Sequence, residues 1–134
     1  MAARYFTPED ANETLDEVRP LTEELVRHRR ALGDLQDRQA SLIGRIAGNG
    51  GNVEPHELQE VQERLDEEVA GIARCVALIH ELGALVKDLD EGLVDFPARR
   101  EGEDVLLCWR LGEDEVAFWH GLEEGFSGRK PLPL

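Results

Sequence analysis

The sequence predicts a mainly α-helical α+β protein, in which a long antiparallel helical hairpin is followed by a small C-terminal antiparallel β-sheet. Apolar residues recur at heptad spacing over the first two thirds of the 134-residue chain. A single cluster of glycine and asparagine, at 48–52, interrupts them. After Gly92 the apolar residues alternate instead, with the period of a strand. The length and these patterns together predict one domain over residues 1–134.

The first helix is predicted over residues 8–47. Thr7 offers an N-cap hydroxyl and Pro8 suits the first helical position. Pro20 interrupts the run, so we expect either a kink near residues 16–20 or a short helix before a longer one. The residues expected to face the core are Leu15, Val18, Leu21, Leu25, Leu32, Leu35, Leu42 and Ile46.

The second helix is predicted over residues 54–91, ending near Asp90 to Gly92. Its apolar residues are Leu58, Val61, Leu65, Val69, Ile72, Val76, Ile79, Leu82, Val86 and Leu89. Two helices of this length would reach about 50 Å, and each carries apolar residues outside one narrow seam. We therefore expect a homodimer in which two hairpins form a four-helix, coiled-coil-like bundle. In the alternative, the C-terminal segment covers the free flank within one chain.

The small sheet is predicted over residues 93–120, followed by an irregular tail over 121–134. The expected strands are residues 93–96 before Pro97, 105–111 and 116–120, with a turn at 112–115. Residues 4–6 could add an edge strand. The tail would dock through Leu122, Phe126 or Leu132.

The charge of the chain excludes several classes of partner. It has 29 acidic against 15 basic residues and a formal charge of −14, which repels nucleic-acid phosphates and anionic membrane surfaces. The chain lacks a signal-peptide pattern and a membrane-spanning apolar stretch, so we expect a cytoplasmic protein. Cys75 and Cys108 are expected as reduced thiols. More than half of the net negative charge lies on residues 48–92. Its densest part, Glu54 to Glu68, falls at the turn end of the hairpin, which a protein partner would meet first.

Several ordered motifs resemble a known family. They are Arg4-Tyr5-Phe6-Thr7, Lys87-Asp88-Leu89, Gly92-Leu93-Val94-Asp95-Phe96-Pro97, Leu107-Cys108-Trp109-Arg110, Gly112-Glu113, Trp119-His120, Gly125-Phe126 and Gly128-Arg129. The chain resembles the small bacterial proteins grouped as domain of unknown function 2203, over essentially its whole length. The resemblance implies no activity, substrate or cofactor. It points to residues 87–129 as the segment that would hold a site.

This segment contains the candidate ligand-binding residues, which are Asp95, Cys108, Trp109, Glu113, Trp119 and His120. Cys108 and His120 could act as nucleophile and base, or as two metal ligands completed by Asp95. A turn at 112–115 would pair Trp109 with Phe118 and Leu107 with His120, leaving Cys108 and His120 on opposite faces. A shift of one residue would bring them to the same face.

Simpler structural roles compete with each candidate. Cys108 would be a small buried hydrophobe, and His120 would cap the edge of the core by donating to a carbonyl. The two tryptophans would pack the sheet against the helices. The acids Asp88, Asp90, Glu91 and Asp95 could chelate a divalent cation or form a solvated face, so Asp88, Asp95 and His120 are the metal candidates.

A second candidate site lies in the helical hairpin. Antiparallel pairing about the turn at 48–52 would place His28 near residues 72–76, close to Cys75. A polar core residue that fixes the register is one interpretation, and a His/Cys site is the other.

The leading hypothesis for the function is a dimeric scaffold or adaptor without catalytic activity. The alternative is a small metal- or ligand-binding protein or enzyme with its site at Asp95, Cys108, Glu113, Trp119 and His120; the sequence names no cofactor for it.

Overall fold

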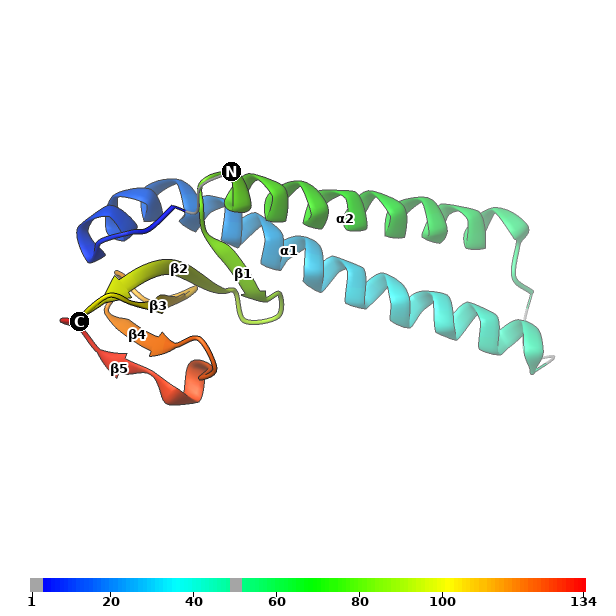
Figure 1. The fold of residues 1–134 in the computed structure, drawn as a ribbon. Coiled ribbons are helices and arrows are strands. Elements are labelled where there is room, and N and C mark those ends of the chain that lie inside the picture. Colours follow the sequence, from blue (N-terminus) through cyan, green and yellow to red (C-terminus); the bar gives the residue numbers. More distant parts are fainter. Residues whose placement is uncertain (1–3, 49–51) are drawn as a thin grey trace.

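The computed structural model describes residues 4–48 and 52–134 and shows a mixed α+β fold (Figure 1). Helices α1 (Pro8–Ala47) and α2 (Pro55–Glu81) form an antiparallel hairpin. The strands are β1 (Leu85–Asp88), β2 (Leu93–Arg100), β3 (Glu103–Arg110), β4 (Phe118–Gly121) and β5 (Lys130–Pro131), and the 3-10 turn η1 (Phe126–Gly128) precedes the last. They make one antiparallel sheet in the order β1-β2-β3-β4-β5. Three residues of the predicted turn, 49–51, lie outside the described part.

Helix α1 begins as its sequence predicts. The Thr7 hydroxyl accepts a hydrogen bond from the Asp10 amide at 3.1 Å, and the Asp10 carboxylate accepts one from the Thr7 amide at 3.2 Å. Pro20 lies inside the helix without ending it, so the expectation of a separate short first helix is wrong. Near Pro20, the buried Thr22 hydroxyl donates to the Val18 carbonyl at 2.8 Å.

Helix α2 ends at Glu81, about ten residues before the predicted end, and the prediction of a helix to residues 90–92 is wrong. Gly83 leaves the helix with a φ of +96°, and a Cβ there would lie 3.0 Å from Arg4 Cδ. The chain then reverses, and Val86 pairs with Val94 in the sheet. Val86 satisfies both the heptad and the alternating pattern, so periodicity alone could not separate helix from strand there.

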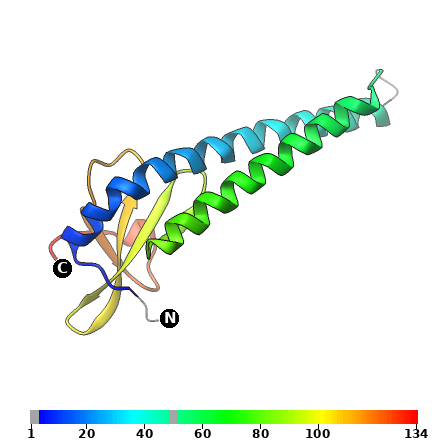
Figure 2. The same cartoon turned by 90° about the horizontal axis from the view of Figure 1, so that it is seen from above.

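The sheet packs one face against the half of the hairpin that carries the start of α1, as the two views show (Figures 1 and 2). The largest fully buried side chains of this core are Val18 and Leu25 of α1, Ile79 of α2, Val94 and Phe96 of β2, Leu107 and Trp109 of β3, and Val116. The expected role of Trp109 as packing material is confirmed. Its indole N–H donates to the Glu113 carbonyl at 3.0 Å, which satisfies the one polar group of a buried side chain.

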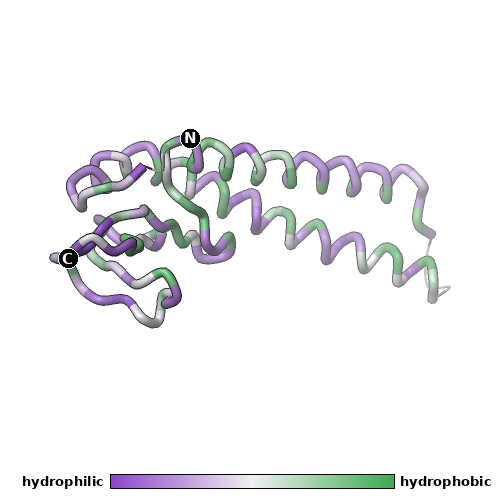
Figure 3. The backbone as a smooth tube through the Cα atoms, viewed as in Figure 1, coloured by the Kyte–Doolittle hydropathy of each residue, from purple (hydrophilic) through white to green (hydrophobic). Residues whose placement is uncertain are grey.

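The other half of the hairpin extends beyond the sheet as a two-helix arm, formed by residues 30–48 and 52–70 (Figure 2). Its own core is small and contains Leu42, Val61 and Leu65. Hydrophobic segments also recur at the end of α1 (Figure 3), where Ile46, expected in the core, is 51% exposed. In the described residues, neither helix offers an apolar stretch that would reach across a bilayer. The structure describes one chain, so the homodimer and the four-helix bundle stay predictions.

Strand β2 continues through Pro97 to Arg100, so the prediction that it ends at residue 96 is wrong. Strand β1 covers β2 only as far as Asp95, and the Pro97 carbonyl accepts instead from the Phe6 amide at 2.7 Å. Proline is tolerated on this uncovered side because no ladder bond is needed from its nitrogen. Residues 4–6 therefore contribute one backbone hydrogen bond and do not form the edge strand that they could have added.

The register of β3 and β4 differs by one residue from the predicted one. Leu106 pairs with His120 and Leu107 with Trp119, whereas Leu107 was expected opposite His120. The connection over residues 111–117 is longer than the predicted turn because helix α1 holds it. Arg19 donates to the carbonyls of Glu113 and Asp114 at 3.0 and 2.7 Å. The tail is also more regular than predicted, since β5 pairs with β4.

Candidate functional site

The register brings Asp95, Cys108 and His120 to the face of the sheet that points away from the helices. Asp95 of β2 lies directly opposite Cys108 of β3, and His120 of β4 pairs with Leu106, two residues before Cys108. Directly paired residues, and residues two apart on one strand, point to the same face of a sheet. Three adjacent strands therefore each contribute one side chain, and we call these three residues the sheet cluster.

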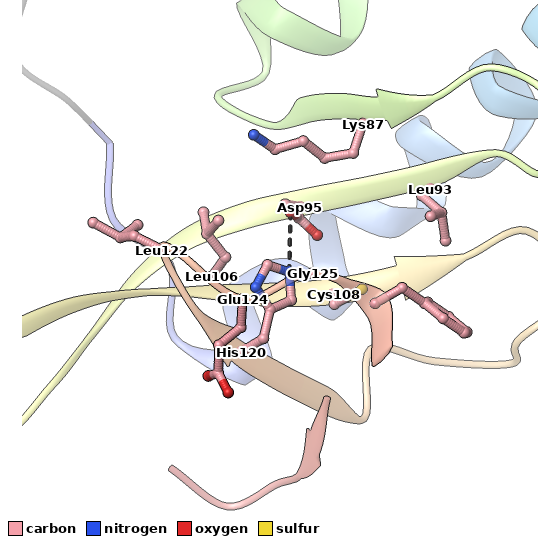
Figure 4. Close-up of a pocket in the computed structure, with 10 residues that line it drawn as sticks. Lys87, Leu93, Asp95, Leu106, Cys108, His120, Leu122, Glu124 and Gly125 are labelled. Atoms are coloured by element: carbon pink, nitrogen blue, oxygen red, sulfur yellow. Dashed lines mark hydrogen bonds and ion pairs between the residues drawn. The ribbon is translucent and has the colours of Figure 1, made fainter. Parts of the chain in front are cut away.

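The sheet cluster is buried although it lies on the outer face. Asp95, Cys108 and His120 are 2%, 2% and 3% exposed. The candidate ligand atoms, a carboxylate oxygen, a thiol sulfur and an imidazole nitrogen, all lie within 4.8 Å of one another. They line a pocket of about 260 Å³ whose rim includes Lys87, Glu124 and Phe126 (Figure 4). Buried polar groups at the base of an open pocket are a common arrangement for ligand binding.

Hydrogen bonds fix the orientation of the His120 ring. Its Nδ1 lies 2.8 Å from the Gly121 carbonyl oxygen, which can only accept, so Nδ1 carries a proton. Its Nε2 lies 3.2 Å from the Asp95 carboxylate (Figure 4). The imidazole thus presents Nε2 to the cluster. A metal-bound histidine is held in the same way, by a carbonyl or carboxylate on the nitrogen that does not bind the ion.

Burial disfavours the negatively charged forms of Asp95 and Cys108. Burial raises the pKa of Asp95 above its ordinary value, although the neighbouring His120 opposes the shift. Burial, and next the negative charge of Asp95, raise the pKa of Cys108 to about 12. The sulfur is therefore a thiol at neutral pH and a poor nucleophile. A bound cation would reverse this, because a coordinating thiol loses its proton.

The other candidate residues lie elsewhere. Trp109 faces the core, and the Glu113 carboxylate holds the Arg110 amide at 2.7 Å and the Arg129 guanidinium at 2.7 and 2.9 Å. Trp119 is half-buried at the edge of the core. The Asp88 carboxylate accepts from the backbone amides of the connection that follows it, so it is not in the sheet cluster.

Sequence reasoning missed the pocket walls. Lys87, Leu93, Leu106, Leu122, Glu124, Gly125 and Phe126 complete the lining. Glu124 is placed by its contacts, since its carboxylate accepts from the Gly121 amide and from Lys130, both at 2.8 Å. The signal available was the motif Gly125-Phe126, which follows Trp119-His120 closely in the chain.

The fold and this site define an α+β protein with a helical hairpin and a buried carboxylate–thiol–imidazole cluster on the free face of its sheet. A family model described as "Uncharacterized conserved protein (DUF2203)" matches residues 4–132, and the chain belongs to this family. Searches of curated proteins and of solved structures give no match. The family that the motifs resembled is thus confirmed.

Proposed function

We propose that the protein binds a divalent transition-metal ion, best fitted by zinc, through Asp95, Cys108 and His120. The observation that carries the proposal is the meeting of three buried ligand atoms from three strands at the base of one pocket. Zinc binds sulfur at about 2.3 Å and nitrogen or oxygen at about 2.0–2.2 Å, so two ligand atoms of a tetrahedral site lie about 3.4 Å apart. The 3.2 Å between Asp95 Oδ2 and His120 Nε2 fits that spacing.

Three protein ligands leave one position of a tetrahedral ion open. Closed structural zinc sites use four protein ligands, whereas sites that bind a small molecule or water keep one free. The free position would face the pocket beside Lys87 and Phe126. This supports a small-ligand-binding role for the metal.

The test is a cobalt(II) titration of metal-free protein in a Cys75→Ser background, where Cys108 is the sole thiol. We expect one equivalent to bind with an intense sulfur-to-cobalt charge-transfer band, because Cys108 is a ligand. The Cys75→Ser/Cys108→Ser double variant should lose the band. If instead the sheet cluster is only a hydrogen-bonded polar group, cobalt will give no such band in the Cys75→Ser protein, and the proposal fails.

We also propose that the hairpin arm makes the protein a homodimeric scaffold. One face of α1 meets the connection between β1 and β2 through Val26 and Arg29, and Arg29 pairs with Asp90 at 3.1 Å. The same face continues along the arm at residue spacings of three and four. Its next residues are Gly33, Gln36, Ala40, Ile43 and Ala47, none of them charged, in a chain of which 33% is charged. Such a stripe favours packing against another helix.

The dimensions of the arm favour a second copy as its partner. The arm is about 27 Å long over residues 30–48, and two packed helices are about 20 Å wide. Two arms face to face would bury about 1,000 Å² in total, which is the lower limit for a biological interface. The sheet occupies the same side of the hairpin at its other end, so the copies would lie antiparallel with their sheets apart (Figure 2).

Sedimentation velocity at micromolar concentration tests the arm. The unaltered protein should be a dimer, and Ile43→Glu should make it a monomer because two copies would each bury a charge. Ser41→Glu, on the other side of the exposed helix, is the matched control and should remain dimeric. A monomeric unaltered protein would overturn the scaffold proposal.

A further inference from the structure

A second cluster of the same chemical composition lies between the two helices, where its side chains are buried or half-buried. It consists of Glu24 and His28 of α1 and Cys75 of α2, and their ligand atoms lie within 4.8 Å of one another. Glu24 Oε2 is 3.3 Å from His28 Nε2 and 3.2 Å from Cys75 Sγ. Glu24 and His28 are four residues apart and therefore share one face of α1. We call these three residues the hairpin cluster.

Helix α2 orients the His28 ring from the other side. Its Nδ1 lies 2.7 Å from Glu68 Oε2, and a carboxylate can only accept, so Nδ1 carries a proton. Gly71 makes room for the ring, because a Cβ there would lie 2.5 Å from His28 Nε2. Glu68 and Gly71 thus hold the imidazole with Nε2 toward Glu24. A carboxylate on the distal nitrogen is the usual outer partner of a metal-bound histidine.

The charges around the hairpin cluster suit a cation. Hydrogen bonds from Cys75 and Arg74 lower the pKa of Glu24 to about 2, so it is ionised at neutral pH. Burial, and next the nearby Glu24, raise the pKa of the Cys75 thiol to about 11. Arg74 forms an ion pair with Glu24, but its side chain is 61% exposed and has room to turn into solvent. A carboxylate and a thiol that face one imidazole are the donors a thiophilic ion takes.

We propose that Glu24, His28 and Cys75 form a second site for a divalent transition-metal ion, with Glu68 as the positioning residue for His28. Binding would release the Cys75 thiol proton to solvent and form the metal–sulfur bond, and Arg74 would give up its contact with Glu24. The ion would cross-link helices whose ligands are about fifty residues apart in the chain. The proposal goes beyond the sheet cluster and shares no residue with it.

The cluster also has a simpler explanation, in which it is a hydrogen-bonded polar layer that fixes the register of the hairpin. That explanation accounts for His28 between two carboxylates without any ion. The two explanations differ in one observable, because a polar layer gives no metal–sulfur bond. The experiment therefore monitors the metal–sulfur bond.

Cobalt(II) is titrated into metal-free Cys108→Ser protein, in which Cys75 is the sole thiol. We expect one equivalent of cobalt to bind with a sulfur-to-cobalt charge-transfer band. At a pH below the thiol pKa, each ion should release at least one proton, the one from the Cys75 thiol. The band should vanish in Cys75→Ser/Cys108→Ser. Absence of the band from the Cys108→Ser protein, with circular dichroism showing the helices intact, overturns the proposal.

Glu68→Gln in the same Cys108→Ser background tests the positioning role. We expect cobalt affinity to fall about 10- to 100-fold while the band keeps its shape, since the ligands are unchanged. Glu67→Gln, one residue away and exposed, removes the same charge from the helix and should leave the affinity unchanged. Equal effects from the two variants would show a general loss of negative charge and overturn the role of Glu68. Because each site is tested with the other cysteine removed, failure of one proposal leaves the other intact.

Discussion

Zinc is expected to raise the free energy of unfolding of the Cys75→Ser protein by about 4 kcal/mol when its free concentration is roughly 1,000 times the dissociation constant. The gain arises because the ion binds the folded sheet cluster and has no assembled site in the unfolded chain. Urea unfolding with and without zinc measures it. An unchanged midpoint at saturating zinc would contradict the proposed site.

Asp95→Asn should abolish the stabilisation by zinc without destabilising the metal-free protein. In metal-free protein the folded state binds the Asp95 proton more tightly than the unfolded state, since burial raises the pKa of the carboxyl. Stability is therefore full at a pH below the ordinary aspartate pKa and falls as the pH rises to the raised value. At neutral pH the asparagine side chain avoids the buried charge, so the metal-free variant should be as stable as the unaltered protein or more stable. The zinc-dependent gain should disappear, because a carboxylate ligand is lost.

Asp104→Asn is the matched control for this pair of measurements. Asp104 lies on β3 and pairs with Arg99 at 3.2 Å, but its side chain is 45% exposed. An exposed ion pair contributes about 0–1 kcal/mol, and no ligand is removed. Zinc should thus stabilise Asp104→Asn as much as the unaltered protein. A loss of the zinc effect in both variants would show that it is not specific to the sheet cluster.

Trp109→Ala should lower the free energy of unfolding by about 3–5 kcal/mol, the range for removing a fully buried aromatic side chain. Trp109 is 0% exposed, and its ring fills the core between the sheet and α1. The loss is a large fraction of the roughly 5–15 kcal/mol of a typical domain, so the urea midpoint should fall markedly. Urea unfolding followed by circular dichroism measures it.

Trp119→Ala provides the comparison for Trp109→Ala. Trp119 is half-buried at the edge of the core, beside the Arg100 guanidinium and the Lys130 ammonium. Its loss removes less buried area, so we expect a cost below that of Trp109→Ala. If the two variants were equally destabilised, the sheet would not be packed on the hairpin through Trp109 as described.

The parts of the fold that local pattern determines could be predicted from the sequence. The heptad run and the capping residues located α1 over residues 8–47, and counting back from the turn placed His28 beside Cys75. The end of α2 could not be predicted, because Val86 fits both periodicities and the helix ends at Gly83, whose φ is +96° and which lies close against Phe6. That contact joins residues far apart in the chain.

The sheet cluster could not be predicted either, because it also depends on contacts between residues far apart in the chain. Whether Cys108 and His120 share a face follows from a one-residue difference in register. Arg19 and Asn12 of α1 set that register by holding the connection at Glu113 and Val116, which are 94 and 104 residues further along the chain. The residue types of the site were visible in the sequence, whereas their meeting was not.

The most direct test of the central claim is X-ray absorption at the zinc edge of Cys75→Ser protein loaded with one equivalent of zinc. The proposed site predicts a first shell with one sulfur at about 2.3 Å and the remaining ligands nitrogen or oxygen at about 2.0–2.2 Å. The sulfur must then be Cys108, the only thiol left. A shell of nitrogen and oxygen alone would contradict the account.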